Sequence, residues 1–147
     1  MQHSGLASAF AWFLLGCATA VEQDPASPAV ASADVATTPE AVVEAQLQAY
    51  NARDIEAFMA TMHPDVELFA IGDPTPRASG AEAVREMYAG LFEKSPGLHS
   101  ELVHRAVIGN RIVDHERITG RQGGEVLELV MVYEVEEGGI RRAWSIR

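Results

Sequence analysis

The spacing of apolar residues changes once along this chain, and that change restricts the folds open to it. In the first part of the chain most apolar residues recur every three or four positions, as on one face of a helix. In the last third, apolar and polar residues alternate, as in half-buried strands. Four such runs are expected, separated by glycine-containing hairpin turns: 98–108, 110–120, 125–136 and 139–147. Helices followed by an antiparallel meander predict an α+β domain.

The segment before the meander predicts three helices and one short strand. Thr38 and Pro39 are typical of a helix cap and of the first helical position, and Asp54 can cap a second helix. The expected helices cover 39–51, 54–62 and 80–95, the expected strand covers 66–70, and a proline-rich loop covers 72–80. We expect the three N-terminal helices to pack on one face of a curved antiparallel sheet.

The segment before the domain predicts export. Residues 5–16 are apolar apart from Ser8, too short to cross a bilayer and of the length of a secretory signal core. Leu14-Leu15-Gly16-Cys17 resembles the lipobox of bacterial lipoproteins, in which the cysteine receives the lipid. Two alternatives remain: cleavage after Ala20 by ordinary signal peptidase, and a buried helix with an inert cysteine. The favoured prediction is a lipoprotein anchored to a membrane through Cys17, in the periplasm or at the cell surface. Cleavage after Ala20 would instead give a soluble periplasmic or secreted protein.

A composition change marks the domain boundary. Residues 17–38 are rich in alanine, serine and proline and show no apolar period, which is typical of a flexible tether. The sequence therefore predicts a signal peptide at 1–16, a tether at 17–38 and a folded domain at 39–147.

The charge balance excludes two classes of partner. The chain has 21 acidic and 11 basic residues and a formal net charge of −10. Nucleic-acid binding and adsorption to anionic lipid both need a basic surface, so we expect no nucleic-acid partner and no membrane contact beyond the lipid anchor. Cys17 is the single cysteine, so no intrachain disulfide can form.

Four short motifs carry a resemblance to a known superfamily. They are Ala49-Tyr-Asn-Ala-Arg-Asp-Ile-Glu-Ala-Phe58, His63-Pro-Asp-Val66, Ser79-Gly80 before a helix, and Tyr133-Glu-Val-Glu-Glu-Gly-Gly-Ile140. They are similar to motifs of the nuclear transport factor 2-like superfamily, which includes SnoaL-like and ketosteroid-isomerase-like domains. The resemblance implies a cystatin-like roll, a cone-shaped α+β barrel with a pocket between the first helix and the sheet. It implies no single activity, because this fold hosts isomerases, dehydratases, epoxide hydrolases, cyclases and non-enzymes.

Comparison with ketosteroid isomerases tests for one set of catalytic residues. Those enzymes use an Asp base opposite a Tyr and a protonated Asp. By the resemblance, the base, the Tyr and the second Asp fall on Ala70, Gln46 and Met131, so all three groups are replaced. Tyr50, one helical turn after Gln46, and Asp73 in the loop are near substitutes. The alternatives are a half-buried aromatic for Tyr50 and a turn-forming residue for Asp73.

A second resemblance concerns limonene-epoxide-hydrolase-like proteins, which use an Asp–Arg–Asp set. His115-Glu-Arg-Ile-Thr119 and Ala143-Trp-Ser-Ile146 are similar to their two strand motifs, with Arg117 kept and Thr119 and Ile146 at the Asp positions. Neither replacement can act as a general base at neutral pH. The resemblance implies that the strand face with His115, Arg117 and Thr119 points into the pocket. The alternatives are a structural ion pair for Arg117 and a hydrogen-bonded sheet position for His115.

These comparisons define the candidate site. On the following strand, Leu127, Leu129, Met131, Tyr133 and Val135 share one face and are predicted to line the pocket. The candidate catalytic residues are Asp73, His115 and Tyr50. The candidate ligand-binding residues are Gln46, Tyr50, Arg117, Thr119, Met131 and Tyr133. A pocket of this kind suits an apolar molecule that carries an oxygen or a carboxylate.

No cofactor and no metal site are predicted. His99, His104 and His115 fall on neighbouring expected strands, but His99 and His104 are five residues apart. In a regular strand they would face opposite sides of the sheet, which argues against a shared metal ion.

Three functions stay open from the sequence alone. The favoured one is an exported protein that binds a small, largely apolar molecule. The second is an isomerase- or hydrolase-like enzyme that uses Asp73 or His115 as its base. The third is a homodimeric interaction module that pairs through the sheet, with Val126, Val130 and Val132 supplying the contact.

Overall fold

The computed structural model of the chain describes residues 37–147. The predicted signal peptide at 1–16, the predicted lipid-attachment residue Cys17 and nearly all of the predicted tether lie outside the described residues. Within residues 37–147, no helix is both long and apolar enough to cross a membrane.

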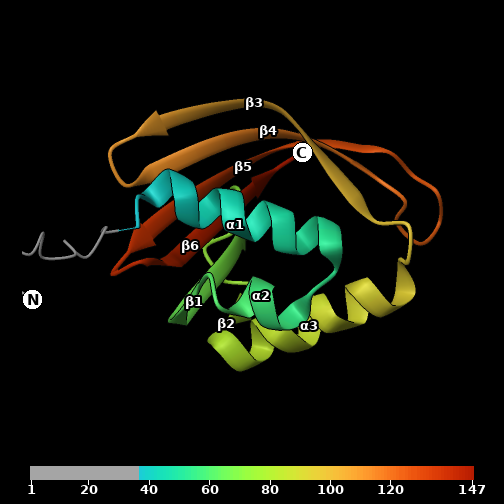
Figure 1. Ribbon diagram of the computed structural model, residues 1–147, viewed down its shortest axis with the longest axis horizontal. Helices are drawn as coiled ribbons and strands as arrows, with labels where there is room; N and C mark the ends of the chain where they lie inside the picture. Colours follow the sequence, from blue (N-terminus) through green and yellow to red (C-terminus); the bar gives the residue numbers. More distant parts are fainter. Residues whose placement is uncertain (1–36) are drawn as a thin grey trace, which may run out of the picture. The chain divides into compact units, whose positions relative to one another are not determined.

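Three helices lie on one side of the domain, as the sequence predicts (Figure 1). They are α1 (Pro39–Ala52), α2 (Ile55–Met59) and α3 (Ala81–Lys94). The Thr38 hydroxyl accepts a hydrogen bond from the Ala41 amide at 3.2 Å, which caps α1. The Asp54 carboxylate accepts from the amides of Glu56 and Ala57, both at 3.0 Å, which caps α2. Local capping therefore sets where both helices begin.

A curved, six-stranded mixed sheet forms the other layer (Figure 1). Its strands are β1 (Met62–Ala70), β2 (Ala78–Ser79), β3 (His99–Ile108), β4 (Arg111–Thr119), β5 (Leu127–Glu136) and β6 (Gly139–Ile146). Their order across the sheet is β2-β1-β6-β5-β4-β3. The predicted meander is confirmed, because β3 to β6 pair antiparallel in sequence order. The α+β fold class is confirmed with it.

Three details differ from the sequence predictions. First, β1 runs parallel to β6, so the sheet is not fully antiparallel; the long chain between these two strands leaves their relative direction free of any hairpin constraint. Second, the expected loop 72–80 contains β2, whose Ala78 pairs with Leu68 of β1. Third, α2 stops at Met59 rather than near residue 62, because Met62 already pairs with Ile140 in the sheet.

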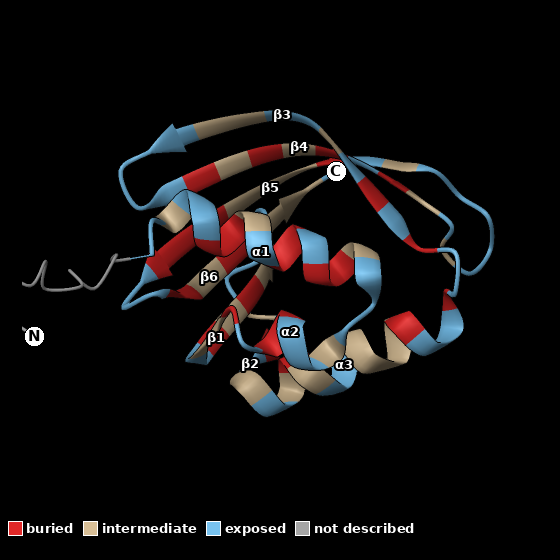
Figure 2. Ribbon diagram, in the orientation of Figure 1, coloured by how far each residue is buried: buried red, intermediate tan, exposed pale blue. Residues whose placement is uncertain are grey.

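Aromatic side chains from all three helices pack together under the sheet. The ring centroids of Phe58 and Tyr88 lie 4.3 Å apart, and those of Tyr50 and Phe92 lie 5.7 Å apart with the rings edge to face. Phe58 is fully buried. Figure 2 marks buried positions along α1 and along the strands of the sheet. This aromatic packing fixes α1 and α3 against each other and so frames the space between them and the sheet.

A close backbone contact holds the β4–β5 connection against the end of α3. Gly120 has a left-handed φ of 69°, and a Cβ there would overlap the carbonyl oxygen of Gly97. The neighbouring Gln122 amide donates to the Ser95 hydroxyl at 3.0 Å. Only glycine fits Gly120 on both counts, conformation and space.

We expect Gly120→Ala to lower the free energy of unfolding by about 3 kcal/mol, combining a left-handed backbone cost with a backbone overlap. Gly124→Ala is the matched control, because Gly124 also has a positive φ, 75°, but a Cβ added there would meet nothing within 4 Å. The control should lose only about 1 kcal/mol. Urea unfolding of the two variants measures the difference, and equal losses would show that the Gly97 contact adds nothing.

Candidate functional site

A pocket of about 840 Å³ lies between α1, α3 and the inner face of the sheet. Apolar side chains form much of its wall, among them Leu47 of α1, Leu91 of α3 and Leu129 of β5. Polar groups from separate elements also reach it, including Gln46, Tyr50, Tyr88, Glu116 and Tyr133. The wall therefore combines apolar side chains with polar and charged ones from several elements, and a concave site that offers both kinds of contact is typical of small-molecule binding.

The resemblance to epoxide hydrolases implies that the Arg117 face of β4 points into the pocket. In the structure the other face points inward. Ile112, Asp114, Glu116 and Ile118 are buried, whereas Arg117 is exposed. The expectation that His115, Arg117 and Thr119 point into the pocket is therefore wrong. Two isoleucines occupy the buried face and anchor it in the core, which decides the register of the whole strand.

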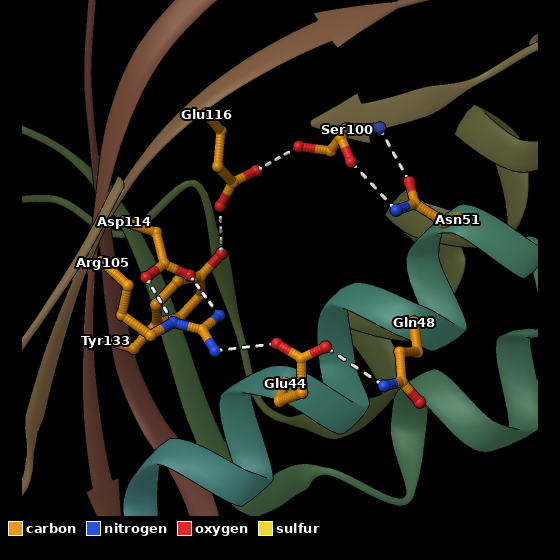
Figure 3. Close-up of polar contacts among 8 residues, drawn as sticks. All are labelled: Glu44, Gln48, Asn51, Ser100, Arg105, Asp114, Glu116 and Tyr133. Carbon is orange, nitrogen blue, oxygen red and sulfur yellow. Dashed lines mark hydrogen bonds and ion pairs between the residues drawn. The ribbon is translucent and has the colours of Figure 1, made fainter. Parts of the chain in front are cut away.

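Glu116 is the buried carboxyl group of the pocket (Figure 3). The Ser100 hydroxyl donates to Glu116 Oε2 at 2.6 Å, and the Tyr133 hydroxyl donates to Glu116 Oε1 at 3.0 Å. Burial raises the pKa of this carboxyl, and the two hydrogen bonds partly oppose the rise. Glu116 is thus a carboxyl group that holds its proton more strongly than an exposed glutamate and that two hydroxyls keep in position.

Asp114, two residues earlier on the same face, is fully compensated by a cation (Figure 3). Arg105 of β3 lies directly opposite it and donates Nε and Nη2 to its two carboxylate oxygens, both at 2.7 Å. The remaining Nη1 of Arg105 reaches Glu44 of α1 at 2.8 Å, and Gln48 donates to the other Glu44 oxygen at 3.1 Å. The bidentate pair of Arg105 and Asp114 is structural, since both carboxylate oxygens of the buried Asp114 accept from the guanidinium.

Asn51 joins the end of α1 to the same part of the sheet. Its amide nitrogen donates to the Ser100 carbonyl at 2.9 Å, and its amide oxygen accepts from the Ser100 backbone N–H at 2.7 Å. Because Ser100 also holds Glu116, Asn51 positions the Glu116 donor relative to α1 (Figure 3).

Gln46 contributes an unused acceptor. It is only 5% exposed, it lines the pocket, and its Oε1 has no hydrogen-bond partner among residues 37–147. A buried polar atom without a partner costs about 1–3 kcal/mol, so such atoms are rare and need an explanation. A donor group on a bound molecule would satisfy this oxygen.

Two tyrosines stand beside these groups. Burial raises the pKa of Tyr50 well above its ordinary value and that of Tyr88 to about 12. The charge of Glu116 adds to both rises, whereas the charge of Arg121 opposes them. Both phenols therefore stay protonated at neutral pH and are able to donate hydrogen bonds within the pocket.

The structure brings together only some of the residues predicted from the sequence. Gln46, Tyr50, Met131 and Tyr133 line the pocket. The apolar face of β5 also points inward as predicted, with Leu129, Tyr133 and Val135 buried. The sequence therefore identified the α1 and β5 walls of the site.

The other candidates lie outside it. His115 is on the outer sheet face, where it meets Glu128 at 2.8 Å, and Arg117 faces Glu101 at 3.8 Å. Thr119 shares that outer face and does not line the pocket. Asp73 is exposed and accepts from the Thr75 amide at 2.9 Å, the turn-forming role named as its alternative. Neither predicted base is thus in the pocket, because one is on the wrong face and the other is in a solvent-exposed turn.

The structure also corrects the predicted orientation of His99 and His104. A bulge between Leu102 and His104 shifts the register of β3, so His99 pairs with Thr119 and His104 with His115, both on the outer face of β4. The prediction that His99 and His104 face opposite sides is therefore wrong. Within residues 37–147, no group of three or more His, Cys, Asp or Glu side chains is arranged to hold a metal ion.

Sequence reasoning missed Glu116, Ser100 and Arg105. One signal was present: the face of β4 that carries Asp114 and Glu116 also carries Ile112 and Ile118, whereas the other face has only one aliphatic residue, Val113. Counting aliphatic residues on each face favours the observed orientation. No pattern in the sequence pairs Ser100 or Arg105 with the acids of β4, since that depends on the strand register and the bulge.

The fold and the pocket define a cystatin-like α+β roll, and comparison with known proteins agrees. The model of the SnoaL-like domain family matches residues 43–143, and the chain belongs to this family. Among curated protein sequences, none matches the chain.

Solved structures share the fold at low sequence identity. A cystatin-fold protein from Novosphingobium aromaticivorans is 24% identical with a TM-score of 0.69, covering 75% of this chain and 98% of that one. A protein described as a SnoaL-like polyketide cyclase from Jannaschia sp. CCS1 is 19% identical with a TM-score of 0.63, covering 77% and 87%. A protein described as a polyketide cyclase from Sinorhizobium meliloti is 18% identical with a TM-score of 0.62, covering 71% and 93%. At these identities the likeness establishes the fold alone.

The raised pKa of Glu116 gives a pH dependence of stability. Below the ordinary glutamate pKa of 4.5, the carboxyl is protonated in both the folded and the unfolded chain, so its burial costs the folded chain no ionisation free energy. As the pH rises above that value, the unfolded chain releases the proton first, so the folded chain loses stability until its own, higher pKa is passed. The loss is about 1.4 kcal/mol for each pH unit that separates the folded pKa from the unfolded one.

Thermal unfolding of wild type and Glu116→Gln between pH 4 and about 8 measures this loss. The melting temperature of wild type should fall relative to that of Glu116→Gln as the pH rises, while exposed Glu125→Gln should track wild type. A gap that stays constant or moves the other way would show that folding does not raise the pKa of Glu116.

Proposed function

We propose that this chain binds a small, largely apolar molecule in the pocket between α1, α3 and the sheet. The observation that carries the proposal is that one pocket is lined both by a buried carboxyl group, Glu116, and by Gln46, whose buried Oε1 has no hydrogen-bond partner among residues 37–147. Folding alone gives no reason to keep both, since apolar residues of similar volume would pack there at lower cost.

The size of the pocket supports this function. Its volume of about 840 Å³ falls in the range of about 300–1,000 Å³ that is usual for small-molecule sites. A ligand inside it would rest on Leu129 and Met131 and present a hydroxyl or amine to Gln46 Oε1. Tyr50 and Tyr88 would donate to a ligand oxygen, because both phenols hold their protons.

Proton transfer is a second candidate function of the same pocket. Glu116 has the properties of a general acid or base: burial, a raised pKa and two fixed hydroxyl contacts. It takes the place of Asp73 and His115 in the isomerase- or hydrolase-like hypothesis. The related fold of proteins described as polyketide cyclases makes proton exchange beside a ligand carbonyl the chemistry to assay first.

Blocking the pocket tests ligand binding. Met131→Trp places a large ring in the pocket, and Val126→Trp adds the same ring at a site that is 52% exposed. Native mass spectrometry should detect a retained small molecule on wild type and Val126→Trp, and none on Met131→Trp. The neutral apolar dye N-phenyl-1-naphthylamine should bind the first two with similar affinity and bind Met131→Trp about tenfold or more weakly, a loss of about 1.4 kcal/mol or more.

Circular dichroism checks that both variants are folded. A wild-type protein that carries no small molecule and binds no dye contradicts the proposed function. Equal dye binding by wild type and Met131→Trp would place any binding site elsewhere.

We also propose that the chain is exported and anchored through lipid on Cys17, on the strength of the lipobox-like Leu14-Leu15-Gly16-Cys17. Cys17→Ser should move the protein from the membrane fraction to the soluble fraction of its host, since it removes the sulfur that would receive the lipid. Mass spectrometry of the N-terminus checks the modification directly. If the variant stays in the membrane fraction, the anchor is not this cysteine.

A further inference from the structure

The basic side chains of this domain fall into two groups. All 11 lysine and arginine residues lie within the described residues. Six arginines pair with carboxylates, and Arg53 donates to the backbone carbonyls of Asn51 and Leu98. The six are Arg85, Arg105, Arg111, Arg117, Arg141 and Arg142. Basic residues away from the pocket are thus all matched by acceptors.

The other four basic residues all line the pocket. They are Arg77, Lys94, Arg121 and Arg147, and none has a carboxylate within ion-pair distance among residues 37–147. The chain carries a net charge of −10, so acidic partners are abundant on its surface. Unpaired cations concentrated at one cavity of an acidic protein make that cavity locally attractive to anions.

Arg121 is the best placed of the four. It lies on the β4–β5 connection that Gly120 and the Gln122–Ser95 hydrogen bond hold against the end of α3. It is partly buried, whereas Arg77, Lys94 and Arg147 are exposed. It lines the pocket together with Tyr50 and Tyr88, and its positive charge opposes the rise in the pKa of both phenols, so the guanidinium lies near them.

The other three basic residues of the pocket lie in different surroundings from Arg121. Lys94 lies in the last turn of α3, where a positive charge is also favoured by the helix dipole. Arg77 and Arg147 share a small adjoining hollow of about 210 Å³ with Ser145. Arg121 therefore carries the inference, and the other three add to the positive potential around it.

We propose that the ligand of this pocket is amphipathic, with an apolar body inside the pocket and an anionic group, a carboxylate, bound by Arg121. This deepens the proposed function and rests on it. The apolar body lies along Leu129 and Met131, and a donor group of the ligand reaches Gln46 Oε1. The guanidinium supplies a planar pair of N–H donors that matches a carboxylate.

The acids of the pocket do not cancel this charge. Glu86 and Glu116 are the two acidic residues among those lining it. Glu116 is engaged by Ser100 and Tyr133, and Glu86 is exposed on α3. Four cations against these two carboxyls leave the pocket lining positive in a protein that is negative as a whole.

Two dyes with one apolar frame test the inference on the full chain. 8-Anilinonaphthalene-1-sulfonate and N-phenyl-1-naphthylamine share the phenyl-naphthylamine frame, and only the first carries an anion. We expect Arg121→Gln to raise the dissociation constant of the sulfonate dye about tenfold, since a charge-assisted contact is lost. The same variant should change that of the neutral dye by less than about twofold, because the apolar wall is intact.

Arg117→Gln is the matched control, because it removes one positive charge from the outer sheet face without touching the pocket. It should leave both dissociation constants unchanged. Arg121→Lys keeps the charge and should retain most of the affinity for the sulfonate dye. If Arg121→Gln and Arg117→Gln affect the two dyes alike, the anion site is overturned, while neutral-dye binding still supports the proposed function.

If Arg121→Gln fails to fold, the salt dependence of dye binding by the wild-type chain tests the anion site instead. Raising ionic strength from about 0.05 M to about 0.5 M should weaken binding of the sulfonate dye and leave the neutral dye unaffected. An equal response of both dyes overturns the anion site. Failure of wild type to bind either dye overturns both this inference and the proposed function.

Discussion

Two carboxyl groups on consecutive inward positions of β4, Asp114 and Glu116, impose the constraint on which the polar structure of this domain depends. A carboxyl group removed from water must be paired, hydrogen-bonded or protonated. Asp114 is paired with Arg105, and that arginine also binds Glu44, so the compensation ties the edge of the sheet to α1. Glu116 is hydrogen-bonded and has a raised pKa instead. The same burial thus produces a structural ion pair at one position and a carboxyl group with a raised pKa two residues later.

The difference between the two acids comes from what lies across from each. β3 offers Arg105 directly opposite Asp114, but it offers Leu102 opposite Glu116. The hydroxyls that reach Glu116 come from Ser100 and Tyr133, and these neutral donors only partly oppose the rise in pKa that burial causes. Asn51 then fixes Ser100 to the end of α1, so the orientation of Glu116 depends on helix packing as much as on the sheet.

The fold could be predicted from the sequence because its determinants are local: the cap at Thr38, the alternation of the four meander strands and the glycine turns between them. Four of the candidate residues, Gln46, Tyr50, Met131 and Tyr133, line the pocket, because they lie on faces of α1 and β5 whose orientation follows from the apolar pattern. The prediction of which face of β4 points into the pocket is wrong. It follows the resemblance to epoxide-hydrolase motifs, whereas the number of aliphatic residues on each face of the strand favours the opposite orientation. The partners of Glu116 and Asp114 depend on the register of β3 and its bulge, which are set by long-range pairing that residue patterns do not encode.

The uneven distribution of charge compensation links the fold to the pocket. Away from the pocket, arginines bind carboxylates or backbone carbonyls, including the buried pair that holds β3, β4 and α1 together. At the pocket, the compensation is incomplete in two ways: Gln46 presents an acceptor without a donor, and Arg121 presents donors without a carboxylate partner among residues 37–147. A molecule that supplies both a donor and an anionic acceptor would complete the set. Elements as distant in the chain as α1 and the β4–β5 connection therefore contribute polar groups without protein partners to one pocket.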